Sequence, residues 1–278
     1  MKILLTGAAG FIGNSIAQDL LKKGYEIVTI GKSEPSNLDC THINMDLLTP
    51  DFITIEKIGA FDTLIHCSFI MASSENVDDI NVLNHNNKVS ENIVKISEVL
   101  SINHLINLSS IAVYPNIDGE YTEDSPINTS FNNDCIYGLS KICAEHVFNY
   151  FLTKKKNIPV TNLRISQVYG EGMRQDRTYY IMKDELLSKN QITVWSNGER
   201  VSNFIQIDKV IDAIHFFITH KDNAGIYNLG GKNLSYKDLA LELISAYGNE
   251  KSEIILIDKG IKSKCFINTK KIDQLLIK

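Results

Sequence analysis

Short, almost wholly apolar runs alternate with amphipathic stretches along most of the chain. The first run, residues 2–6, is followed by glycines and then by apolar residues spaced as on one face of a helix, with Gly24 where a helix C-terminal cap belongs. Strands that are buried on both faces form continuous apolar runs, and strands that alternate with helices indicate a parallel sheet covered on both sides. Further strands are predicted over residues 25–30, 63–67, 104–108 and 160–165, and further helices over 82–100 and 137–152.

The pattern becomes less regular beyond residue 168. Residues 203–207 predict one more strand, which leads into a helix that continues through Ile218, whereas residues 169–198 show no clear period. We therefore expect an α/β fold, a doubly wound parallel sheet with a smaller, interleaved C-terminal lobe. Residues 1–168 and about 203–230 are assigned to the sheet domain, and about 169–202 and 231–278 to the lobe.

Composition and charge exclude several classes of protein. The 278 residues are 44% hydrophobic and 22% charged, as in ordinary globular proteins. A net charge of −5 gives no positive field for nucleic acid or an anionic membrane, and no apolar run approaches the length of a membrane span or of a signal-peptide core. Five scattered cysteines without a C-x-x-C pair and seven dispersed histidines predict reduced thiols, no metal site and a cytoplasmic location.

A glycine-rich turn separates the first predicted strand from the first predicted helix. Gly7, Gly10 and Gly13 have G-x-x-G-x-x-G spacing, and Phe11 and Ile12 open the helix. Glycine lets backbone amides approach a pyrophosphate, and the helix N-terminus supplies partial positive charge. A turn that only packs is the alternative, but the position between strand and helix favours a dinucleotide site in a Rossmann-type sheet.

The end of the second strand bears on the choice of dinucleotide. A carboxylate at this tip binds the adenosine ribose hydroxyls of NAD, whereas a cation accommodates the 2′-phosphate of NADP. The tip carries Lys32 and Ser33 and no acid, which favours NADP(H) and leaves NAD(H) possible; a solvated turn lysine is the alternative. Asp46 and Leu47 are candidates for the adenine contact, with an exposed loop aspartate as the alternative for Asp46.

A phenol and an ammonium group lie four residues apart, on one face of a predicted helix. Because the Lys141 cation favours tyrosinate, it is expected to lower the pKa of Tyr137 and make the phenol a general acid or base. Such a pair on any surface helix would mean little by itself. Upstream, however, a predicted strand ends in Ser109 and Ser110, at the edge where parallel sheets bind ligands.

Taken together, these motifs resemble the extended short-chain dehydrogenase/reductase family, also called the NAD-dependent epimerase/dehydratase family. The resemblance rests on the glycine turn, on Ser-Ser-x-x-Val-Tyr ending at Tyr114 and on Tyr-x-x-x-Lys at 137–141. It continues, in order, through Asp-Thr-Leu-Ile-His at 62–66, the asparagines at 86–92, Thr-Glu-Asp-Ser-Pro at 122–126 and Leu-Arg-Ile-Ser-Gln-Val-Tyr-Gly at 163–170, as far as about residue 218.

The resemblance implies a catalytic set and a substrate class. Ser110 would hydrogen-bond the substrate carbonyl or hydroxyl, Tyr137 would act as the acid or base, and Lys141 would hold the nicotinamide ribose. Hydride would pass between the nicotinamide and a carbon of a nucleotide-activated sugar. The family resemblance also implies that the sheet domain binds the dinucleotide, that the smaller lobe binds the substrate, and that two copies form a homodimer through residues 82–100 and 137–152.

Departures from the family pattern narrow the activity. Ile111 and Ala112 stand where 4,6-dehydratases carry an Asp-Glu pair, so dehydration is not expected. Ala112 and Gly172 stand where GDP-fucose synthase has the Cys and His of its ring-carbon epimerisation. Reduction of a 4-keto-6-deoxysugar with NADPH, as in deoxysugar or polysaccharide synthesis, remains the first hypothesis. A 4-epimerase with bound NAD is the second, and a non-catalytic dinucleotide sensor is the third.

The substrate lobe fits the family pattern less well. Gln167 replaces the usual Asn, and Ser202 stands where an Arg often meets the sugar-nucleotide pyrophosphate. The missing cation is expected from Arg200, Arg174 or Arg177, with solvated loop arginines as the alternative. Gln167, Arg174 and Arg200 are therefore the substrate-binding candidates of the lobe, beside Ser110 and Tyr137.

Overall fold

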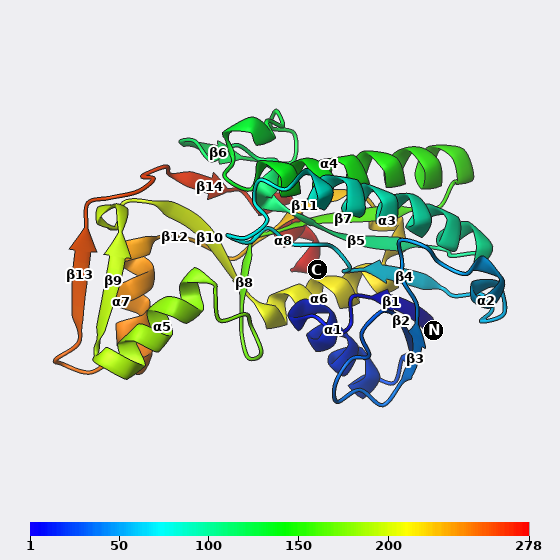
Figure 1. The fold of residues 1–278 in the computed structure, drawn as a ribbon, viewed down its shortest axis with the longest axis horizontal. Coiled ribbons are helices and arrows are strands. Elements are labelled where there is room, and N and C mark those ends of the chain that lie inside the picture. The colour runs from blue at the N-terminus through cyan, green and yellow to red at the C-terminus, as the bar shows by residue number, and fades with distance from the viewer. Residues whose placement is uncertain (278) are drawn as a thin grey trace.

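In the computed structural model, which describes residues 1–277, seven parallel strands form the central sheet (Figure 1). The chain builds outward from β1 in both directions, so the strand order reverses between β1 and β4, and ligands of such sheets bind outside the carboxyl ends of the strands at this point. The order across the sheet is β11 (Ile226–Leu229), β7 (Val160–Ile165), β5 (Leu105–Ser110), β4 (Thr63–His66), β1 (Lys2–Thr6), β2 (Glu26–Gly31) and β3 (Thr41–Asn44).

Helices cover both faces of this sheet. On β1, Ile3 and Leu5 pack toward one layer of helices and Leu4 toward the other, as the alternation of side chains in a strand requires. The first layer contains α1 (Phe11–Lys22), α6 (Ile207–Thr219) and α8 (Lys270–Leu276); the second contains α2 (Phe52–Glu56), α3 (Ile80–Val99) and α4 (Cys135–Phe148). The predicted doubly wound α/β fold is confirmed.

The ends of the helices follow local capping chemistry. Gly24 adopts a left-handed φ of 81°, and its N–H closes α1 on the Leu21 carbonyl. Helix α3 starts two residues earlier than the apolar pattern predicts, because the Asp79 side chain accepts the Asn81 N–H. Helix α4 starts at Cys135, also two residues before its prediction, and ends in a π-helical turn over Asn149–Lys154.

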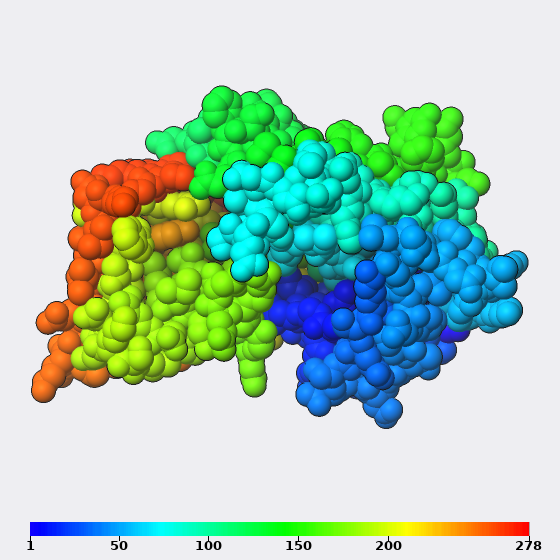
Figure 2. All heavy atoms as spheres, in the orientation of Figure 1, coloured from blue at the N-terminus to red at the C-terminus, as the bar shows by residue number. Residues whose placement is uncertain are grey.

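The C-terminal part forms a second, smaller body of sheets and helices (Figure 1). Strand β10 pairs with β8 and β12 in this body, whereas α6 and β11, which follow it, return to the central sheet. In the space-filling view, the surface is hollowed between the yellow-green segment of this body and the blue N-terminal residues (Figure 2). The small sheets are β12 (Lys232–Ser235), β10 (Val201–Gln206) and β8 (Gln167–Tyr169); β13 (Glu253–Ile257) and β9 (Gln191–Trp195); and β14 (Cys265–Ile267) and β6 (Gly119–Tyr121). The helices are α5 (Thr178–Lys189) and α7 (Tyr236–Tyr247).

Candidate active site

The glycine turn forms a close-packed cradle at the N-terminus of α1. Gly7 has a φ of 73°, and a Cβ on it would lie 2.8 Å from the Cys67 carbonyl carbon; a Cβ on Gly13 would overlap the Gly7 carbonyl oxygen. Gly10 precedes the helix and has no side chain to accept the N–H groups of the first turn. These amides remain available to an anion, so the turn fits a dinucleotide pyrophosphate.

A methyl group in this cradle should therefore weaken dinucleotide binding. In Gly13→Ala the new Cβ pushes against the Gly7 carbonyl and opens the turn, so we expect the Kd for NADPH and NADH to rise at least about tenfold, or about 1.4 kcal/mol. Fluorescence titration measures both affinities. Gly225→Ala is the control, because its Cβ would make ordinary contacts with Tyr227. Unchanged affinity in Gly13→Ala would contradict the assignment.

A cleft of about 220 Å³ continues from the glycine turn along the end of β2. Lys32, Ser33, Asp46 and Leu47 all line it, so the structure brings these four predicted residues together. Lys32 Nζ lies 3.0 Å from Asp46 Oδ2, an ion pair that the sequence did not predict. A hydrogen bond from the Leu48 N–H lowers the pKa of Asp46, and Lys32 adds to this effect, so Asp46 stays ionised.

The three predicted catalytic residues meet where α4 crosses the carboxyl end of β5. Tyr137 and Lys141 are buried on α4, and Ser110, the last residue of β5, accepts the Ala112 N–H at 3.1 Å. Gly138 allows this close crossing, because a Cβ there would overlap the Ala112 carbonyl oxygen. The backbone thus holds the phenol and the Ser110 hydroxyl together.

The expected effect of Lys141 on Tyr137 requires correction. Burial raises the pKa of Tyr137 above its ordinary value. The Ser110 hydrogen bond and the Arg177 charge lower this pKa, but by less than burial raises it. Lys141 Nζ donates instead to the Leu108 carbonyl oxygen at 2.6 Å and lies 5.4 Å from the centre of the Tyr137 ring. Tyr137 is therefore a neutral phenol, ready to donate a proton.

The substrate candidates of the smaller lobe occupy different environments. Gln167 donates to the Ser202 hydroxyl at 2.7 Å. Arg174 pairs with Asp176 on the surface, and Arg200 stacks on the Tyr236 ring at 5.4 Å. Arg177 instead reaches across to the Ala72 carbonyl oxygen.

Ala72 packs in one small cluster with Tyr137. Of the three arginines considered, Arg177 is thus the one that the structure brings to the catalytic phenol. The sequence alone did not distinguish it from the other two.

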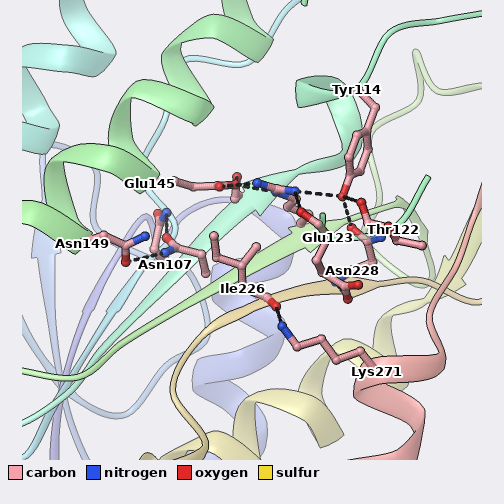
Figure 3. A network of polar contacts seen from close by, with 12 residues as sticks. Asn107, Tyr114, Thr122, Glu123, Glu145, Asn149, Ile226, Asn228 and Lys271 are labelled. Atoms are coloured by element: carbon pink, nitrogen blue, oxygen red, sulfur yellow. Dashed lines mark hydrogen bonds and ion pairs between the residues drawn. The ribbon is translucent and has the colours of Figure 1, made fainter. Parts of the chain in front are cut away.

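A buried polar network behind α4 was missed by the sequence analysis (Figure 3). The Glu145 carboxylate accepts from Ser109 Oγ at 2.5 Å and from both Nε and Nη2 of Arg164, at 3.0 and 2.8 Å. Arg164 Nη1 donates to the Tyr114 hydroxyl, which in turn donates to Asn228 Oδ1 at 2.7 Å. The available signals were an acid one helical turn after Lys141 and an arginine inside an apolar strand.

Residues 1–277 contain neither a metal-binding cluster nor a helix that could span a membrane. Among these residues, no three His, Cys, Asp or Glu side chains gather closely enough to hold a metal ion. The helices of the same part of the chain are all too short or too polar to cross a membrane.

Comparison with known proteins shows the family to which this chain belongs. Residues 3–230 match the NAD dependent epimerase/dehydratase family, and the chain belongs to this family. The resemblance inferred from the motifs is thereby confirmed.

Individual relatives are distant but cover most of the chain. An uncharacterized UDP-glucose epimerase of Bacillus subtilis is 26% identical over 99% of this chain and 92% of its own length. CDP-abequose synthase of Yersinia pseudotuberculosis is 27% identical over 80% of this chain and 75% of its own. The solved UDP-glucuronic acid 4-epimerase of Bacillus cereus, in complex with UDP-glucuronic acid and NAD, has a TM-score of 0.83, 25% identity and coverage of 100% and 93%.

Proposed function

We propose that the chain is an NADPH-dependent reductase of a nucleotide-linked 4-keto-6-deoxysugar. The observation that carries the proposal is the close approach of Ser110, Tyr137 and Lys141 at the carboxyl end of β5, in a sheet whose strand β1 leads into the glycine cradle. The residues after Ser110 are the apolar Ile111 and Ala112, which supply no acid or base for eliminating water. The experiment that tests this is turnover of a panel of nucleotide-linked 4-ketosugars with NADPH.

The residues of the chain divide the work of such a reduction. The dinucleotide, when bound, supplies the hydride, and the first turn of α1 would hold its pyrophosphate. The Ser110 hydroxyl would hydrogen-bond the substrate carbonyl oxygen, and the neutral Tyr137 would give its proton to that oxygen as the alcohol forms. The Lys141 ammonium would stabilise the resulting tyrosinate until solvent returns the proton.

Cofactor choice is proposed to rest on Lys32. The Asp46 carboxylate pairs with this lysine, so a 2′-phosphate must compete with Asp46 for it. Because charge-assisted hydrogen bonds contribute about 1.5–3 kcal/mol, Lys32→Ala should raise the Kd for NADPH about 10- to 100-fold and change that for NADH little. Titration with both dinucleotides measures this, with Lys22→Ala on the far end of α1 as the control. An equal loss for both would exclude a 2′-phosphate contact.

A nucleotide-sugar 4-epimerase is the second candidate. The observation that favours it is the Bacillus cereus 4-epimerase, whose structure contains NAD. Such an enzyme would oxidise the sugar hydroxyl at C4 and then reduce the resulting ketone from the opposite face, which needs the same Ser110, Tyr137 and Lys141. Tightly held NAD that survives purification, together with interconversion of two nucleotide sugars, would replace the reductase proposal with this one.

The proposal extends to how the chain binds its substrate and how two copies assemble. Arg177 is proposed to supply positive charge to the nucleotide sugar, because it reaches the catalytic phenol from the smaller lobe. The two-part division of the chain and the homodimer through residues 82–100 and 137–152 remain predictions.

A further inference from the structure

The ring of Phe69 covers the ammonium group of Lys141. Lys141 Nζ lies 3.2 Å from the centre of this ring and donates to the Leu108 carbonyl oxygen at 2.6 Å, whereas the centre of the Tyr137 ring is farther away, at 5.4 Å. Phe69 follows the end of β4, one residue after Ser68, which lines the dinucleotide cleft. The side chain of Lys141 is only 3% exposed, so water contributes little to holding its charge.

The backbone next to Phe69 is fixed. The Asn86 side chain accepts the Ile70 N–H at 2.9 Å and donates to the Ile70 carbonyl oxygen at 3.0 Å. The same amide donates to Ser140 Oγ on α4. The aromatic ring is therefore held against α4 rather than carried on an unanchored loop.

The titratable groups around Lys141 offer little unshared negative charge. Burial holds the pKa of Lys141 well below its ordinary value; Cys67 and Glu145 oppose this shift only in part, and the Glu145 carboxylate, one turn along α4, is already bound by Arg164. Burial raises the pKa of Cys67 to about 12, so this thiol is neutral, and burial together with Lys141 keeps the pKa of His66 well below its ordinary value. Tyr137, also on α4, is neutral as well, as described above.

We propose that Phe69 is a positioning residue that keeps Lys141 charged and directs its ammonium group through a cation–π contact. The electron-rich ring face attracts the cation, and such contacts are strongest where water is excluded. The inference deepens the proposed function, because it rests on Lys141 stabilising the tyrosinate. Removing the ring should make the ammonium easier to deprotonate, while a ring of the same shape should preserve it.

The test measures the pKa of Lys141 directly in the ligand-free protein. Protein labelled with ¹³Cε-lysine is titrated by NMR, and the Lys141 resonance is assigned as the one missing from Lys141→Arg. Phe69→Leu should lower the pKa of Lys141 by about one unit or more, and Phe69→Tyr should change it little. Phe52→Leu is the control, because Phe52 packs on the same core with no cation over its ring in the described chain.

The outcomes separate this inference from the proposed function. An unchanged Lys141 pKa in a folded Phe69→Leu protein overturns the inference, even where wild type reduces a ketosugar. A lowered pKa supports it, even where no nucleotide sugar is turned over and the proposed function fails. Where turnover is found, the fall of kcat at high pH should move to lower pH by the same amount. If Phe69→Leu does not fold, Phe69→Met removes the ring with a side chain that adapts to irregular space.

Discussion

Replacing Tyr137 by phenylalanine is expected to lower kcat by about 10²- to 10⁴-fold, with the Kd for NADPH nearly unchanged. The phenol is buried against Ser110, and burial raises its pKa, so at neutral pH it carries the proton that a reduced carbonyl oxygen must receive. Phenylalanine fills the same space and removes that proton. Steady-state turnover with a 4-ketosugar nucleotide and fluorescence titration of NADPH measure the two quantities.

The pH dependence of the same reaction has a definite sign. Burial raises the pKa of Tyr137 and lowers that of Lys141, so as pH rises the rate of reduction should fall first through the pKa of Lys141, whose charge would stabilise the tyrosinate, while Tyr137 still carries its proton. The opposite slope would indicate a base in the rate-limiting step.

Controls assign this loss to the one phenol. Tyr150→Phe changes an exposed tyrosine on the π-helical turn and should leave turnover unchanged. Full activity in Tyr137→Phe would remove this residue from the mechanism. Absence of turnover in wild type with every ketosugar or ketone offered would instead support a dinucleotide-binding sensor.

Features that depend on spacing within one element could be predicted from the sequence. Gly7, Gly10 and Gly13 lie within one turn, and Tyr137 and Lys141 lie on one helix face, so their relative positions follow from local geometry. The apolar runs likewise located all but two strands of the central sheet. One of the two, β3 (Thr41–Asn44), is a short edge strand with exposed ends, no fully buried residue and one aliphatic side chain, so it carries too weak an apolar signal.

Features that depend on burial or on contacts between distant segments could not be predicted. Lys141 was expected to lower the pKa of Tyr137, but burial raises that pKa, and burial is a property of the folded protein. The pairing of Lys32 with Asp46 depends on how two loops meet at the end of the sheet. The placement of Arg177, rather than Arg174 or Arg200, beside the phenol depends on the path of an irregular loop.

Glu145 and Arg164 are expected to have the largest effect on stability. Both side chains are almost fully buried, at 1% and 3% exposure, and the Glu145 carboxylate accepts two hydrogen bonds from the Arg164 guanidinium. Burial opposes the charge of Arg164, but the hydrogen bonds and charge of Glu145 raise its pKa, so the pair is ionised. Glu145→Gln keeps the shape and leaves a buried cation without its counter-charge, which should lower the free energy of unfolding by about 3–5 kcal/mol.

Urea unfolding measures this loss, and two further proteins show its cause. Glu91→Gln makes the same change in the exposed pairs with Lys88 and Lys95 and should leave the urea midpoint nearly unchanged, because water screens these charges. A triple variant, Glu145→Leu with Arg164→Met and Ser109→Ala, replaces the whole polar group by apolar side chains and should recover most of the stability, because no charge is then left unpaired. If Glu145→Gln unfolded at the same urea concentration as wild type, the Arg164 charge would have to be compensated by Tyr114 and the Glu123 carbonyl oxygen, its other contacts, and the network would not depend on the carboxylate.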